Sequence, residues 1–95
     1  MKNIESIEGL KEFLKEFFEK ETVEIYLFGS RARGNFRENS DIDIGILSKS
    51  DISYKLSELR EIIENSNLPQ TVDIVDLNEN KKFLEIVKKE GIKWI

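Results

Sequence analysis

The chain has 95 residues, a formal net charge of −4 at pH 7, a hydrophobic fraction of 39% and a charged fraction of 36%. A single domain over residues 1–95 with one modest core is expected at this length, and the acidic balance argues against extended nucleic acid as a partner. Histidine and cysteine are absent, which excludes disulfides and Ser–His or Cys–His nucleophile pairs. We find neither a signal-peptide pattern nor an apolar run that could span a membrane, and we expect a cytoplasmic protein.

Apolar residues at three- and four-residue spacing predict a helix over residues 6–20, with Asn3 or Ser6 as its N-cap. A β-branched and aromatic run over residues 22–28 predicts the first strand. Residues 29–39 contain two glycines and no apolar period. They predict a turn, with one helical turn as an option, followed by a loop.

Alternating apolar and polar residues predict two more strands, residues 41–47 and 71–77, with a helix over residues 52–65 between them. A last helix is expected from Asn78 or Asn80 to about residue 89, with residues 92–95 as an optional strand. We expect this helix to be buried through Phe83, Leu84, Ile86 and Val87. The order α-β-β-α-β-α(-β) predicts an α/β (α+β) fold. It would be a small mixed sheet with helices packed on one face and a partly open second face.

Two acids on the second predicted strand are the first candidate site residues. Asp41 and Asp43 are two positions apart, so on an extended strand their side chains share one face, whereas three isoleucines occupy the other face. Two neighbouring carboxylates repel each other unless a cation lies between them. An Asp-x-Asp pair alone is more often a solvated strand face, and the assignment therefore depends on what accompanies the pair.

A third acid on the third predicted strand has the matching parity. Asp73 is flanked by Val72 and Ile74, which face the core, so Asp73 is expected on the face that carries the first two acids. Three such carboxylates can hold two Mg²⁺ ions about 3.5–4 Å apart, the separation used for in-line phosphoryl transfer. Asp76 has the opposite parity and is the weaker candidate. Gly45, on the same face as the acids, is expected to leave room for a ligand.

The turn after the first strand supplies a candidate phosphate site. Gly29 follows the strand directly and lets the backbone approach a ligand closely. If a helical turn begins there, its N–H groups and the Ser30 hydroxyl can donate to phosphate oxygens. Arg31 and Arg33 add positive charge and are also candidate nucleotide-binding residues. The sequence leaves open which of the two faces the site.

Two common nucleotide-binding loops do not fit this segment. Gly29 and Gly34 have the glycine spacing of a Walker loop, but Asn35-Phe36 stands where that loop needs Lys followed by Ser or Thr. A Rossmann fingerprint lacks its third glycine in register.

The combined pattern nevertheless resembles a known family. Phe28-Gly29-Ser30, ten intervening residues, Asp41-Ile42-Asp43-Ile44 and then Val72-Asp73-Ile74 resemble the signature of the DNA polymerase β-type nucleotidyltransferases. More narrowly, residues 29–34 and the small size resemble the minimal nucleotidyltransferases. These are the antitoxin halves of HEPN–nucleotidyltransferase toxin–antitoxin pairs. The resemblance covers nearly the whole chain in element order, although few positions carry it specifically.

The resemblance implies a role for each matching residue. Asp41 and Asp43 would bind both Mg²⁺ ions, and Asp73 would bind the catalytic ion and help to deprotonate the acceptor hydroxyl. Gly29 and Ser30 would hold the β- and γ-phosphates of ATP. The resemblance further implies an enzyme that moves AMP from ATP onto a tyrosine of the partner HEPN ribonuclease.

Two other functions stay open at this point. The chain could be a non-catalytic, nucleotide-binding antitoxin that neutralises its partner by occlusion. It could instead modify a small molecule such as an aminoglycoside. The helical domain that larger relatives use to hold an acceptor is missing from this chain, which favours an acceptor brought by a separate partner.

Overall fold

The computed structural model describes residues 4–34, 37 and 40–95. Its elements are α1 (Ile7–Phe17), β1 (Val23–Phe28), α2 (Ser30–Arg33), β2 (Ile42–Ser48), α3 (Ser53–Glu64), β3 (Val72–Asp76), α4 (Lys81–Glu90) and β4 (Ile92–Lys93). This is the predicted order, with α2 as the optional helical turn and β4 as the optional strand. Ser6 is the N-cap of α1, and its side chain accepts a hydrogen bond of 3.1 Å from the Gly9 N–H. The alternative cap, Asn3, and most of the loop after α2 lie outside the described residues.

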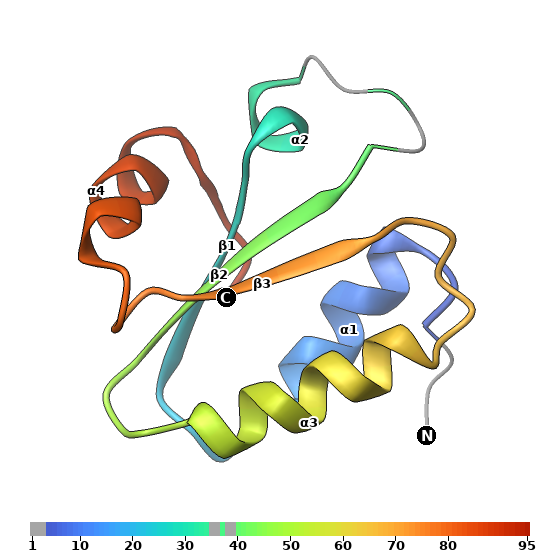
Figure 1. The fold of residues 1–95 in the computed structure, drawn as a ribbon, viewed down its shortest axis with the longest axis horizontal. Coiled ribbons are helices and arrows are strands. Elements are labelled where there is room, and N and C mark those ends of the chain that lie inside the picture. Colours follow the sequence, from blue (N-terminus) through green and yellow to red (C-terminus); the bar gives the residue numbers. More distant parts are fainter. Residues whose placement is uncertain (1–3, 35–36, 38–39) are drawn as a thin grey trace.

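The four strands form one mixed sheet in the order β3-β2-β1-β4 (Figure 1). β1 pairs antiparallel with both β2 and β4, whereas β2 and β3 are parallel. A parallel pair needs a crossover connection, and α3 provides it here. The mixed sheet that the sequence predicts is confirmed.

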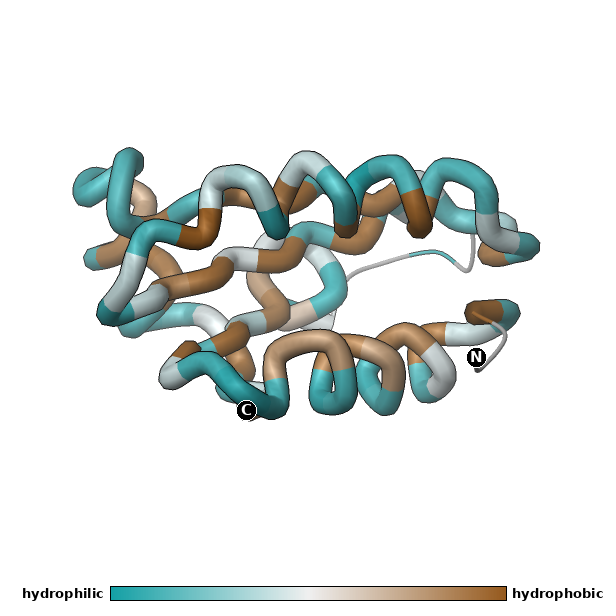
Figure 2. Tube along the Cα trace, turned by 90° about the horizontal axis from the view of Figure 1, so that it is seen from below, coloured by the Kyte–Doolittle hydropathy of each residue, from teal (hydrophilic) through white to brown (hydrophobic). Residues whose placement is uncertain are grey.

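Helices α1 and α3 pack on one face of this sheet. The isoleucines of β2 and the core-facing residues of β1 and β3 meet apolar side chains from both helices in one cluster, whose largest buried members include Leu10, Leu14, Ile25, Ile42, Ile44, Ile46, Leu56 and Leu59. Figure 2 shows hydrophobic residues along the strands and on the inner sides of these helices, with hydrophilic residues outside. None of the described helices has the length and apolar character that crossing a membrane requires.

Helix α4 lies on the opposite face, which corrects one detail of the expected architecture. Val87 and Leu84 pack there against Tyr26 and Phe28 of β1, in a second cluster completed by Leu47, Val75 and Leu77. The expectation that all helices cover one face is therefore wrong. The expected burial of this helix is also only partly correct, because Phe83 and Ile86 are 45% and 51% exposed. Leu84 and Val87 are the residues through which this helix packs on the sheet.

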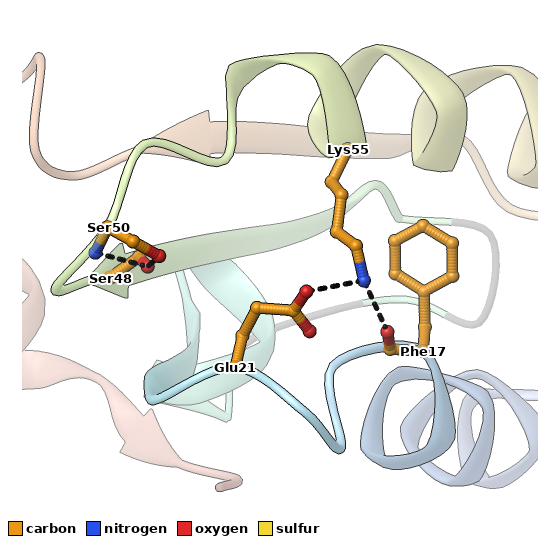
Figure 3. A network of polar contacts seen from close by, with 5 residues as sticks. All are labelled: Phe17, Glu21, Ser48, Ser50 and Lys55. Carbon is orange, nitrogen blue, oxygen red and sulfur yellow. Dashed lines mark hydrogen bonds and ion pairs between the residues drawn. The ribbon is translucent and has the colours of Figure 1, made fainter.

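A partly buried ion pair ties α3 to the segment that follows α1 (Figure 3). The Lys55 ammonium of α3 lies 2.7 Å from a Glu21 carboxylate oxygen and donates a 3.2 Å hydrogen bond to the Phe17 carbonyl at the end of α1. It also lies 5.1 Å from the centre of the Phe17 ring. A cation at the C-terminal carbonyls of a helix is favourable, so Lys55 fixes the end of α1 against α3.

Candidate active site

Asp43 and Asp73 are neighbours on adjacent strands. They are register partners in the parallel β2–β3 pair, so their side chains project from the same face of the sheet. This face is opposite the α1–α3 core, to which the flanking residues Ile42, Ile44 and Ile74 belong. The strand parity that the sequence predicts for these two acids is therefore present in the fold.

The charge environment of Asp43 shows that a third acid lies nearby. Burial raises the pKa of Asp43 most, and the carboxylates of Asp73 and Asp41 raise this pKa further, whereas the Arg33 guanidinium lowers it. Asp41 directly precedes β2. The side chains of Asp41 and Asp73 are exposed, whereas that of Asp43 is half-buried. Three charged side chains thus act on Asp43 at the start of β2.

These acids do not form a closed metal cage. In the part of the chain that the structure describes, no group of three or more His, Cys, Asp or Glu residues is gathered closely enough to hold a metal ion. The donor set still fits Mg²⁺, because this ion commonly uses one or two carboxylates together with phosphate oxygens and water.

Gly29 lies directly against Asp43. A β-carbon at position 29 would collide with the Asp43 carboxylate. The backbone of Gly29 has φ +75° and ψ −154°, a combination that is essentially restricted to glycine. Two independent constraints therefore require glycine here, and both serve to bring the β1–α2 turn against the acid of β2.

The two arginines of α2 have different surroundings. Arg31 is buried, and its guanidinium donates hydrogen bonds of 3.2 and 3.1 Å to the Ser40 carbonyl. It thereby holds the backbone that leads into Asp41, a positioning role that the sequence did not reveal. Arg33 is exposed and close enough to Asp43 to lower its pKa. That either arginine binds nucleotide stays a prediction, and Arg33 is the better placed of the two.

The expected ligand space above Gly45 is already filled. A β-carbon on Gly45 would lie 2.9 Å from the Leu77 side chain, which is fully buried at this point. Glycine is needed here because Leu77 packs onto the strand, and the expectation of an open space is wrong. Leu77 follows β3 directly, and nothing in the β2 sequence points to this contact.

A sequence profile of the family described as "Polymerase beta, Nucleotidyltransferase" matches residues 8–93. Among curated proteins, the chain is similar to the "Probable protein adenylyltransferase MntA" of Haemophilus influenzae (strain Rd). The two are 33% identical over 67 residues, which is 68% of this chain and 59% of the relative. The match thus spans less than two thirds of that relative.

Solved structures share the fold. One described as a toxin–antitoxin crystal structure with AMP-PNP has a TM-score of 0.63 at 26% identity, and the match covers 90% of this chain and 72% of that chain. A crystal structure of a mutant MntA–HpeT toxin–antitoxin has a TM-score of 0.61 at 22% identity, with 90% and 71% covered. The second likeness concerns the fold alone. Together with the family match, these structures confirm the fold expected from the sequence.

Proposed function

The chain belongs to the polymerase β nucleotidyltransferase family, and we propose that it is a Mg²⁺-dependent enzyme that transfers AMP from ATP to a protein hydroxyl group. We further propose that the acceptor is a tyrosine of a HEPN ribonuclease toxin, which this chain silences as the antitoxin. The observation that carries the proposal is the in-register pair of Asp43 and Asp73, with Asp41 beside it and the Gly29 turn against it.

Each acid has a role in this proposal. Asp41 and Asp43 would hold the ions, with Asp73 as a further ligand to one of them. Bound Mg²⁺ would neutralise the triphosphate charge and polarise the α-phosphate. The raised pKa of Asp43 supports a cation site, because a bound cation relieves the repulsion among the carboxylates that helps to raise this pKa.

The transfer itself exchanges one phosphorus–oxygen bond for another. The acceptor hydroxyl oxygen forms a bond to the α-phosphorus of ATP, while the bond from that phosphorus to the bridging oxygen of the β-phosphate breaks. Pyrophosphate leaves, and the hydroxyl proton passes to the Asp73 carboxylate. The exposure of Asp73 supports this role, because an acceptor side chain can reach it from solvent.

ATP is the proposed substrate, with Gly29 and Ser30 on its β- and γ-phosphates. The toxin–antitoxin structure of similar fold is described with AMP-PNP, an ATP analogue, which supports adenosine nucleotide as the ligand. The backbone at Gly29 can approach a phosphate closely because it carries no side chain. The exposed Arg33 adds a cation beside Asp43. Ser30 begins the helical turn that leads from Gly29 to Arg33.

The test is transfer of label from α-labelled ATP and Mg²⁺ to a purified HEPN partner. We expect Asp43→Asn and Asp73→Asn to abolish transfer. Asp76→Asn is the matched control, because Asp76 lies on the same strand with opposite parity, and an amide oxygen can still accept the Asn78 N–H hydrogen bond. Transfer that persists undiminished in Asp43→Asn would remove the proposed site.

The same variants separate catalysis from occlusion. An Asp41→Asn/Asp43→Asn double variant should fail to protect cells from the toxin if the modification neutralises it. Full protection by this variant would favour a binding antitoxin. Transfer to an aminoglycoside in the absence of any protein partner would favour small-molecule modification.

A further inference from the structure

We propose that Phe28 and Phe83 form a platform on which the base of the bound nucleotide stacks. This inference rests on the proposed function, because it assumes that ATP binds at the acids. Neither aromatic residue belongs to the predicted catalytic or phosphate-binding set.

Phe28 lies beside the acids. It is the register partner of Asp43 in the antiparallel β1–β2 pair, and directly opposed residues of such a pair point to the same face. Phe28 is also the residue before Gly29, where the phosphate turn begins. The Phe28 side chain also packs with Leu84 and Val87 of α4 in the second cluster, so it lies next to both the proposed metal site and this helix.

Phe83 extends this surface from the first turn of α4. Its ring centre lies 6.2 Å from that of Phe28, with the ring planes inclined by 52°, which is a normal aromatic pair. Leu84 and Val87 hold the same helix against the sheet, so Phe83 is presented from an anchored element. It is nevertheless 45% exposed, so the pair offers aromatic surface to solvent beside the acids.

A nucleotide base is the occupant that this position favours. If the triphosphate lies at Gly29 and the α-phosphate at the acids, only the ribose separates the base from that point, and the base must lie within one nucleotide length. Bases stack on aromatic side chains with little regard to their identity. The exposed Lys81 and Lys82 precede Phe83 on α4 and suit a ligand that carries phosphate.

The experiment compares the affinities of the whole chain for Mg²⁺–ATP and for Mg²⁺–tripolyphosphate, a probe without base or ribose, by titration calorimetry. We expect Phe83→Ala to weaken ATP binding about 5- to 150-fold, the range that stacking of one base supplies. Tripolyphosphate binding should stay unchanged. Phe83→Trp should restore or strengthen ATP binding, and GTP should follow the same pattern.

Ile86→Ala is the matched control, because Ile86 is another exposed apolar residue on the same helix, 51% exposed. It should leave the affinity for ATP unchanged. The inference is overturned if Phe83→Ala binds ATP as wild type does, or if it loses ATP and tripolyphosphate affinity equally. If the two rings instead bind an apolar residue of the partner, Phe83→Ala would lower transfer to the toxin without changing ATP affinity. That result would also overturn the inference.

The two proposals fail in different ways. Wild-type protein that binds no ATP and transfers no AMP would overturn the proposed function and this inference together. Normal AMP transfer by wild type, with unchanged ATP affinity in Phe83→Ala, would overturn the stacking platform alone.

Discussion

The Asp43 carboxylate fills the space that a β-carbon on Gly29 would occupy. The end of β1 and the start of β2 are therefore in contact at the point where the phosphate site and the metal site of the proposed enzyme meet. Any side chain at position 29 must displace the acid, strain the backbone, or do both.

The first prediction concerns this contact. Gly29→Ala should destabilise the protein by more than about 1–3 kcal/mol, the usual cost of a non-glycine residue in such backbone conformations, because it also collides with Asp43. Gly34→Ala is the control: its φ is also positive, at +83°, but its β-carbon would meet nothing within 4 Å. Thermal unfolding of both variants should show the larger loss at position 29. Equal losses would mean that neither the Asp43 contact nor the special backbone conformation of Gly29 adds to the cost.

The second prediction concerns the buried arginine. Arg31→Met should lower the free energy of unfolding by about 1.5–3 kcal/mol, the usual range for hydrogen bonds from a charged group, because the Ser40 carbonyl loses both donors. Arg33→Met removes an exposed cation of the same helical turn and should change stability by less than about 0.5 kcal/mol. Urea unfolding measures both variants. A stable Arg31→Met protein would show that the bonds to Ser40 are dispensable.

The third prediction concerns pH. The pKa of Asp43 is raised in the folded protein, chiefly by burial and then by Asp73 and Asp41. Its contribution to stability is therefore present at low pH and lost as the pH rises through the folded-state pKa. Without metal, Asp43→Asn should melt at a higher temperature than wild type at pH 7, and this difference should vanish in acid.

Asp51→Asn provides a control of opposite sign. Hydrogen bonds from the Ser53 side chain and backbone lower the pKa of Asp51, so its contribution is present at neutral pH and lost as the pH falls. This variant should melt below wild type at pH 7. If both variants shift the melting temperature in the same direction, the assigned electrostatics are incorrect.

The fourth prediction concerns the ion pair between Lys55 of α3 and Glu21, which follows α1. Lys55→Met should destabilise the protein by about 1–3 kcal/mol, between the values for exposed and fully buried pairs, because it leaves the Glu21 carboxylate partly buried without its cation. The exposed pair of Lys15 and Glu12 is the reference, and Lys15→Met should cost less than about 0.5 kcal/mol. Adding Glu21→Met to Lys55→Met should recover stability. Chemical unfolding of the four proteins tests this.

Strand parity made the central part of the site predictable. The face on which Asp43 and Asp73 lie depends only on local alternation, since Ile42, Ile44 and Ile74 must enter the core. Likewise, a glycine between a strand and a polar segment indicates a close backbone approach without any tertiary information. These features follow from the two-residue alternation along the strands and from the residue type at the turn, both of which the sequence shows directly.

The features that the sequence did not reveal depend on contacts between distant segments. Leu77 closes the space over Gly45 because β3 pairs with β2 and the residue that follows β3 packs onto that strand. Arg31 is charged, and its burial beside the Ser40 carbonyl depends on a contact between residues nine positions apart. Similarly, α4 could have joined α1 and α3, and its amphipathic pattern does not say which face of the sheet it covers.

The strand order has a consequence for how a macromolecule could be modified. Asp73 belongs to β3, the outermost strand on its side of the sheet. A folded acceptor protein that approaches this edge of the sheet can present a side chain to Asp73 while all four strands keep their mutual pairing. The proposed modification of an intact protein therefore demands no opening of this domain.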